Sequence, residues 1–297
     1  MRVLSVGHCT LDHIGLVEYF ARDDEEVEMP TFSVQGGGAA ATAAVALARW
    51  GASTRFIGKV GDDQRGERIE RTFSDEGVAT DHFVYDKGKI SQVRFVLVEA
   101  SSGDRHAYST PGNVGSLQSE EVDSGLVDDH DLLIVDGVFP EVTTAMMKRA
   151  RESDIPVVLK ADHDREALTE CISHASVVVA SEREASAFTG VGRLEGICEA
   201  FLERGPDVAI VTLGDEGAVA LSRNEGFTRV GARSIKMVDP TGAADVFLGA
   251  VGLGVLQKWG LEKLIGFANA AAAVACTGPG GRSSIADRAT LESEIAG

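Results

Sequence analysis

The residues best placed to do chemistry lie at 239–245, where the run DPTGAAD precedes an apolar stretch, 246–251, predicted to be a helix. Small residues at 242–244 would let a ligand approach the free N–H groups of the helix N-terminus, where the dipole favours an anion such as phosphate. A carboxylate there, Asp245, could accept the proton of an attacking hydroxyl. Its simpler role would be to stabilise the helix end.

Two further glycine-rich segments are candidates for ligand loops. Residues 36–38 open a predicted helix after an extended segment, and 278–281 follow the last long apolar stretch. Each pattern is equally typical of a tight turn or a helix cap, so neither assigns a ligand by itself. The P-loop pattern GxxxxGK[ST] does not occur, and the first predicted strand is followed by GHCTLD rather than GxGxxG. The sequence therefore disfavours a P-loop enzyme and a dinucleotide-dependent dehydrogenase.

Short β-branched runs alternate with amphipathic stretches along most of the chain, which predicts an α/β fold with a mainly parallel sheet and helices on both faces. The predicted strands include 3–6, 54–57, 132–135, 156–159, 177–179, 208–212 and 234–238. The predicted helices include 39–50, 66–75, 141–153, 167–174, 182–188 and 194–204. Ligands bind beyond the carboxyl ends of such strands, where the polar residues are Asp12, Asp136, Lys160, Ser181 to Glu184 and Gly214.

Two segments interrupt the alternation, at 13–35 and 92–109. Both are extended and partly polar and have no crossover helix, so we expect them to form a small antiparallel sheet that acts as a lid. Residues 1–12, 36–91 and 110–297 then make up one α/β core that binds the ligands. The chain shows no internal repeat and no low-complexity linker, which disfavours two independent domains.

The composition predicts a soluble globular protein with no nucleic-acid or membrane partner. The 297 residues include 28 Lys and Arg against 46 Asp and Glu, a formal charge of −18, and 44% are hydrophobic. Such an acidic chain would repel nucleic acids and anionic membranes, and no apolar stretch is long enough for a spanning helix. Cys9, Cys171, Cys198 and Cys276 have neither zinc nor disulfide spacing, which favours a cytoplasmic protein with reduced thiols.

Four motifs in the same order make the chain resemble the PfkB, or ribokinase-like, carbohydrate kinases over essentially its full length. Residues 37–51 are similar to the family's N-terminal Gly-Gly signature, and 58–66 are similar to its V-G-D-D-x-x-G segment. Residues 211–219 are similar to its nucleotide-site turn, and 239–245 are similar to its D-T-x-G-A-G-D anion hole and base.

The resemblance implies a ribokinase-like three-layer αβα fold and transfer of the γ-phosphoryl group of ATP to a primary hydroxyl of a small sugar, a ketose or a related sugar. Asp245 would be the general base, and the backbone amides of Gly242, Ala243 and Ala244 would stabilise the transferring group. The implied sugar-binding residues are Asp12, Gly37, Gly38, Thr42 and Asn113, and the implied nucleotide-binding residues are Ser181, Thr212, Gly214, Gly217 and Asn269. Mg²⁺ would lie near Glu184, through water, and a monovalent cation such as K⁺ near Asp239, Thr241, Gly280 and Ser284. The lid would be shared between the subunits of a homodimer.

Three positions depart from the family pattern. Ala244 replaces a glycine, and Thr42 and Ser181 stand where many members have an asparagine. Ala244 still offers its N–H in helical geometry but adds a methyl group beside the phosphate. Ala244 and Ser181 leave a catalytically silent sugar-binding or regulatory protein as an alternative, against which the intact Asp245 argues.

The acceptor is the least determined part of the prediction. Residues 36–66 and 276–282 look most similar to sulfofructose kinases, with ketohexokinases more distant. A sulfonate or phosphate on the sugar would need basic lid residues, whereas the acidic run 23–26 and Val138 favour a neutral sugar. A nucleoside kinase of the same fold would need aromatic residues in the acceptor pocket, for which the candidates are Phe32, Phe95, Tyr108 and Phe139.

Overall fold

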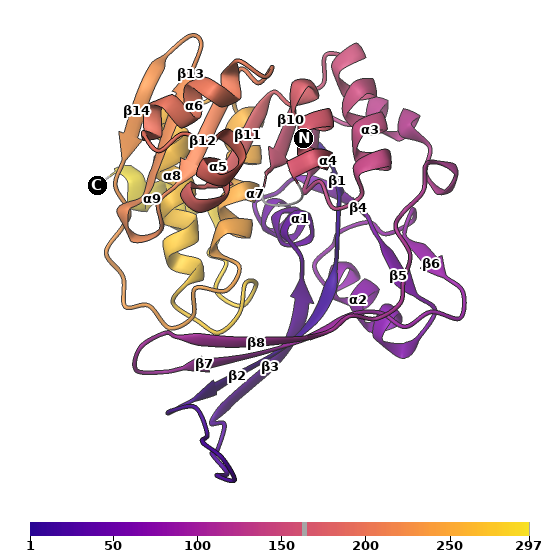
Figure 1. Ribbon diagram of the computed structural model, residues 1–297, viewed down its shortest axis with the longest axis vertical. Coiled ribbons are helices and arrows are strands. Elements are labelled where there is room, and N and C mark those ends of the chain that lie inside the picture. The colour runs from indigo at the N-terminus through magenta and orange to yellow at the C-terminus, as the bar shows by residue number, and fades with distance from the viewer. Residues whose placement is uncertain (162–164, 297) are drawn as a thin grey trace.

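Eight strands form the central sheet in the order β14-β13-β12-β11-β10-β9-β1-β4 (Figure 1). The computed structural model describes residues 1–161 and 165–296. All neighbours from β4 to β12 pair in parallel, and β13 and β14 extend the sheet as antiparallel strands. The strands are β1 (Arg2–Val6), β4 (Ser53–Ile57), β9 (Leu132–Val135), β10 (Val157–Lys160), β11 (Val177–Ser181), β12 (Val208–Thr212), β13 (Ala218–Ser222) and β14 (Gly226–Val230).

Helices cover both faces of this sheet because its strands are apolar on both sides. Successive side chains of a strand point to opposite faces, so Leu132 and Ile134 belong to one core and Leu133 and Val135 to the other. The first core includes side chains of α1, α2, α7, α8 and α9, and the second includes side chains of α3 to α6. The helices are α1 (Ala39–Arg49), α2 (Gln64–Ser74), α3 (Pro140–Glu152), α4 (Arg165–Cys171), α5 (Glu182–Thr189), α6 (Leu194–Leu202), α7 (Ala243–Leu256), α8 (Leu261–Ala275) and α9 (Arg288–Ala296).

A four-stranded sheet, called the small sheet below, stands beside the αβα body in Figure 1. Its order is β3-β2-β7-β8, with β2 and β7 parallel and the outer pairs antiparallel. The strands are β2 (Thr10–Val17), β3 (Thr31–Gly37), β7 (Val93–Glu99) and β8 (Arg105–Thr110). A separate parallel pair joins β5 (Lys59–Gly61) to β6 (Val84–Asp86).

The register of the small sheet divides its side chains between two faces. Asp12 lies opposite Gln35 on β3 and Arg94 on β7, and Arg105 on β8 lies opposite Val98. Because residues two apart on a strand share a face, Arg94 and Val98 lie on the same side of β7. Asp12, Arg94 and Arg105 therefore share one face of the small sheet, which we call the inner face.

The predicted α/β fold with a mainly parallel sheet and a separate small sheet is confirmed. Six of the seven predicted strands coincide with strands of the central sheet, and the six predicted helices coincide with α1 to α6. The helix predicted at 167–174 is divided into α4 and a short 3₁₀ turn at Ile172–His174. Residues 162–164 and 297 of the predicted core lie outside the described residues. No helix of the described chain is long and apolar enough to cross a membrane.

Three local predictions were wrong. The small sheet is mixed and not antiparallel, because β7 returns from the core to pair in parallel with β2, and only the outer pairs are antiparallel. The run 234–238 is not a strand, because β14 ends the sheet at Val230 and the run instead contributes to a wall of a cavity. Asp12 does not follow the first strand, since β1 ends at Val6 and Asp12 lies within β2. The change matters because it puts Asp12 on the small sheet together with Arg94.

Candidate active site

The N-terminus of α7 presents open backbone donors, as the sequence predicted. Gly242 caps the helix with a left-handed φ of 77°, and the N–H groups of Asp245 and Val246 donate to its carbonyl. The N–H group of Ala243 donates to Pro240 at 3.3 Å. Within the described residues, the N–H groups of Gly242 and Ala244 donate to no protein group. Two of the three expected amides are therefore open to an anion, while the third is already partly engaged.

Gly242 is required by its surroundings as well as by its φ. A Cβ atom at this position would lie 2.3 Å from the Cα atom of Gly281. The loop that carries Gly281 therefore packs directly on the turn before α7. This close approach explains why glycine occurs on both sides of the contact.

Asp239 joins that turn to the loop after α8. It is fully buried, and its Oδ1 accepts the N–H of Thr241 at 2.8 Å while Oδ2 accepts the N–H of Gly280 at 2.6 Å. The carbonyl of Cys276 in turn accepts the N–H groups of Val238 and Asp239. These bonds fix the backbone that leads into α7, so the open amides have a defined direction.

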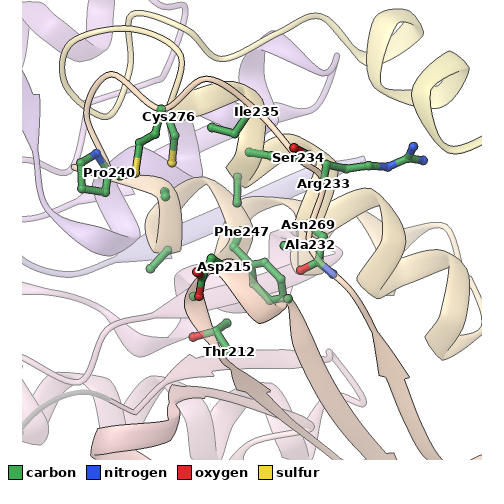
Figure 2. A pocket seen from close by; sticks show the side chains of 17 residues that line it. Thr212, Asp215, Ala232, Arg233, Ser234, Ile235, Pro240, Phe247, Asn269 and Cys276 are labelled. Carbon is green, nitrogen blue, oxygen red and sulfur yellow. The ribbon is translucent and has the colours of Figure 1, made fainter. Parts of the chain in front are cut away.

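Two cavities meet at the α7 N-terminus, and the larger of them, with a volume of about 650 Å³, lies on one side of it. Its lining includes four of the five residues predicted to bind the nucleotide, namely Thr212, Gly214, Gly217 and Asn269. In Figure 2, Thr212 and Asp215 lie in the lower part of the view, and Pro240 and Cys276 lie at the upper left. Most of the lining is apolar, which suits a flat ring system such as a nucleobase.

Asn269 shapes the wall of the larger cavity. It is buried on α8, and its Nδ2 donates to the carbonyls of Val230 and Gly231 at 3.0 and 3.1 Å. Those two bonds tie the segment after β14 to α8. Arg233 in this segment points away from the cavity (Figure 2), and its guanidinium donates to the Glu294 carbonyl.

Ser181 and Glu184 do not line either cavity. They form a capping box at the start of α5, in which the Ser181 hydroxyl accepts the N–H of Glu184 at 3.3 Å and donates to its Oε2 at 2.5 Å. The resemblance implied a nucleotide contact for Ser181 and a magnesium contact for Glu184. Local pairing explains both residues without a ligand.

The smaller cavity, with a volume of about 210 Å³, lies on the other side of the α7 N-terminus and contains the predicted base. Its walls include Asp245 and four of the five residues predicted to bind the sugar, namely Asp12, Gly37, Gly38 and Thr42. The fifth, Asn113, is not part of this wall, because its Oδ1 accepts the N–H of Ile90 in an exposed loop. Pro240 and Ala244 line both cavities, so the α7 N-terminus is the boundary between them.

Asp12 is buried where it can accept hydroxyl hydrogen bonds. Its Oδ1 accepts the Thr10 hydroxyl at 2.6 Å, and its Oδ2 lies 3.5 Å from Nη1 of Arg94. Burial raises the pKa of Asp12 above its ordinary value, and the charges of Arg94 and of the buried Arg282 oppose that rise. A Cβ on Gly37 would lie 2.4 Å from Oδ2 of Asp12, so glycine keeps this carboxylate accessible.

Lys160 contacts the candidate base directly. Its Nζ lies 2.8 Å from Oδ1 of Asp245, and the two side chains are only 14% and 19% exposed. The ion pair joins the carboxyl end of β10 to the first turn of α7 across the smaller cavity. The sequence indicated Lys160 only as a polar residue after a strand, because nothing in the local pattern shows which helix it faces.

The loop after α8 also places a buried guanidinium behind the smaller cavity. Arg282 is 4% exposed, and its Nε lies 3.4 Å from the Thr42 hydroxyl and its Nη1 lies 3.2 Å from the Thr72 hydroxyl. Its guanidinium carbon lies 5.1 Å from the centre of the Phe73 ring. Burial lowers the pKa of Arg282 to about 10, with Asp12 the largest opposing charge. Sequence reasoning missed this residue, because buried arginines carry no periodic signal.

Residues 1–288 match the family described as pfkB family carbohydrate kinase. The chain belongs to this family. It is 28% identical to a ribokinase of Haemophilus influenzae, with 97% of this chain and 96% of that protein covered. It is 30% identical to fructokinase-1 of Oryza sativa subsp. japonica, with 94% and 92% covered.

A solved structure described as a putative ribokinase II from E. coli in complex with ATP and Mg²⁺ has the same fold. It superimposes with a TM-score of 0.85 at 21% identity and covers 99% of both chains. Membership of the pfkB family makes the chain an ATP-dependent carbohydrate kinase. The likeness to sulfofructose kinases within the family stays a prediction.

Proposed function

We propose that the chain transfers the γ-phosphoryl group of ATP to a primary hydroxyl of a small sugar bound in the smaller cavity. The observation that carries this proposal is the meeting of two cavities at one helix N-terminus that offers both open amides and a carboxylate. A nucleotide in the larger cavity would direct its γ-phosphate at Ala244 and Gly242. A sugar in the smaller cavity would meet that phosphate from the side of Asp245.

In the proposed reaction, the sugar hydroxyl oxygen bonds to the γ-phosphorus while the bond to the β–γ bridging oxygen breaks. The electron pair of that bond leaves with ADP, and the hydroxyl proton passes to the Asp245 carboxylate. Lys160 holds this carboxylate at the cavity through their 2.8 Å contact. The amides of Gly242 and Ala244 would stabilise the charge on the transferring oxygens, because they are fixed before the reaction begins.

Metal ions enter this site with the nucleotide. Among the described residues, no group of three or more acidic, histidine or cysteine side chains could hold a metal by itself. Mg²⁺ fits as an ion carried by the phosphates, where it would neutralise their charge. Glu184 would reach it through water only after leaving its capping box. A monovalent cation at Asp239, Thr241, Gly280 and Ser284 also stays a proposal, since both carboxylate oxygens of Asp239 already accept backbone N–H groups.

A sugar suits the smaller cavity better than a nucleoside does. No aromatic side chain is among the described residues that line it. Of the aromatic candidates, Phe139 is buried elsewhere in the second core, and Phe32, Phe95 and Tyr108 are 56%, 46% and 60% exposed. A nucleobase would therefore find no stacking partner there.

The exposed aromatic residues lie on the outer face of the small sheet, where they favour a homodimer. Phe95 stacks on His13 at 4.9 Å and lies opposite Tyr108 on β8. An apolar face of this kind is typical of an interface, and we propose that it packs against the same face of a second copy.

The molar mass from light scattering tests this interface. The wild-type protein should have the mass of a dimer, and Phe95→Asp should have the mass of a monomer. Phe227→Asp, at a 40% exposed position on β14, is the matched control; a monomeric wild type would refute the interface.

Coupled ADP release tests the reaction itself. The protein is incubated with ATP and Mg²⁺ and a panel of ketoses, aldoses, nucleosides, phosphosugars and sulfosugars. We expect turnover with sugars and none with nucleosides. Nucleotide binding without turnover on any acceptor would instead support a catalytically silent sugar-binding protein.

A further inference from the structure

The smaller cavity is rich in basic side chains, although the chain carries a formal charge of −18. Arg94, Arg105 and Lys160 line it together with two carboxylates, Asp12 and Asp245. The charged side chains of the cavity therefore leave a formal surplus of one positive charge. Hydroxyl groups do not require this surplus, because a hydroxyl can donate to a carboxylate and accept from a neutral donor.

Two of these basic residues come from the inner face of the small sheet, on neighbouring strands. Arg94 lies on β7 and contacts Asp12 at 3.5 Å. Arg105 begins β8, and its Nη1 donates to the Thr241 hydroxyl at 3.3 Å. The small sheet thus brings one guanidinium to the sugar-binding carboxylate and another to the turn before α7.

Arg105 has N–H donors that can bind a ligand. A guanidinium carries five N–H donors. Within the described residues, Arg105 forms no ion pair with a carboxylate, and its contact with the Thr241 hydroxyl uses only one of these donors. Arg94 is paired with Asp12 by a single contact of 3.5 Å, and its side chain is 31% exposed. Its other guanidinium N–H groups can therefore also donate to a ligand. Lys160 differs, because it contacts Asp245 at 2.8 Å and serves the base.

We infer that the acceptor is a small sugar that carries a tetrahedral oxyanion, a phosphate or a sulfonate, and that Arg94 and Arg105 bind this group. The guanidinium fork matches such an oxyanion in geometry and charge. The inference rests on the proposed function, because it assigns the smaller cavity to the acceptor. The preference for a neutral sugar depended on residues 23–26 and Val138, and none of these lines the cavity.

Matched pairs of acceptors test the inference. Fructose is compared with its 1-phosphate and 6-phosphate and with 6-sulfofructose, and ribose with its 1-phosphate and 5-phosphate, by ADP release with ATP and Mg²⁺. We expect one anionic sugar to exceed its neutral counterpart about 100-fold in kcat/KM, at about tenfold or more for each charge-assisted hydrogen bond. The phosphate and sulfonate arms identify which oxyanion is bound.

Substitutions then assign the effect to the two arginines. Arg94→Gln and Arg105→Gln should each lower the preference for the anionic sugar about tenfold. The KM for ATP should stay within a factor of about two, since neither residue lines the larger cavity. Arg22→Gln is the matched control: it removes the same charge from an exposed position that is outside the cavity, between β2 and β3.

Two results would overturn the inference without contradicting the proposed kinase activity. One is a neutral sugar as the best acceptor, and the other is an equal fall for charged and neutral sugars in both arginine variants. If no acceptor is turned over, the proposed function fails, and calorimetric titration with the same sugar phosphates decides the inference. Binding that weakens in both variants but not in Arg22→Gln would support it, and no binding to the wild type would refute it.

Discussion

Replacing Asp245 by asparagine tests the proposed base with little change in shape. The amide cannot accept the hydroxyl proton as a carboxylate does, and general-base catalysis contributes about 10²- to 10⁴-fold. We therefore expect kcat to fall by at least about 10²-fold, which is a barrier increase of about 3 kcal/mol. Nucleotide affinity should hardly change, because Asp245 does not line the larger cavity.

The same substitution also breaks the ion pair with Lys160, and its cost can be bounded. At 2.8 Å, an effective dielectric constant of about 20 gives an attraction of about 6 kcal/mol as an upper limit. Exposures of 14% and 19% place the pair between surface pairs and fully buried ones, so the net loss should be about 1–3 kcal/mol. A domain with a stability of about 5–15 kcal/mol stays folded after that loss.

Lys160→Met is the control that separates the two effects. It breaks the same ion pair but keeps the carboxylate, so urea unfolding should show a similar loss of stability while kcat falls much less. Stopped assays of ADP formation give kcat for both variants at saturating sugar and ATP. If Asp245→Asn keeps more than about a tenth of wild-type turnover, or if both variants lose turnover equally, Asp245 is not the base.

Further predictions concern the turn before α7, the larger cavity and acid stability. Gly242→Ala should lower turnover at least about 100-fold and lower the free energy of unfolding by at least about 1–2 kcal/mol. Gly190 has a similar φ of 76°, and a Cβ there would have no atom within 4 Å. In thermal unfolding, Gly190→Ala should therefore lose only the stability that a left-handed backbone costs an alanine. Asn269→Ala should raise the KM for ATP about tenfold with little change in kcat, because the wall after β14 loses two hydrogen bonds. Hydrogen bonds from Arg49 lower the pKa of Glu76 below its usual 4.5, so this carboxylate stabilises the fold above that pH and the effect is lost as the pH falls through the lowered value. Glu76→Gln should therefore be less stable at pH 7 by about 1 kcal/mol and show a shallower loss on acidification, as measured by urea unfolding at a series of pH values.

The sequence predicted what local patterns determine. Buried parallel strands need continuous β-branched runs, so strands such as β9 and β12 were visible without a structure. The run 234–238 places Ile235 and Met237 in the alternating pattern of a half-buried strand and was misread, because only the tertiary fold shows that the sheet ends at β14. Ile235 and Met237 are 36% and 45% exposed on the wall of the larger cavity, and a run of this length does not reveal whether its alternating side chains face a sheet or a cavity.

The binding residues that the sequence missed all depend on register and on packing between layers. Arg94 and Arg105 belong to predicted strands, but their presence on one face follows from the pairing of β7 with β8. The contact of Arg94 with Asp12 follows from the pairing of β2 with β7. The contact of Arg105 with Thr241 follows from the position of the small sheet against the turn before α7. The roles of Asn113 and Glu184 stay predictions, since a family position does not reveal that a side chain is already paired locally.

The division of the site between two structural layers has a consequence for specificity. The open amides, the proposed base and the proposed nucleotide wall belong to α7, α8, the central sheet and the segment after β14, whereas Arg94 and Arg105 belong to the small sheet. No residue of β7 or β8 lines the larger cavity in the described chain. Substitutions on these two strands can therefore change which acceptor is bound while the phosphoryl-transfer machinery stays the same. On the inference that Arg94 and Arg105 bind an oxyanion, the inner face of the small sheet determines which charge the acceptor carries, and the net charge of the chain does not.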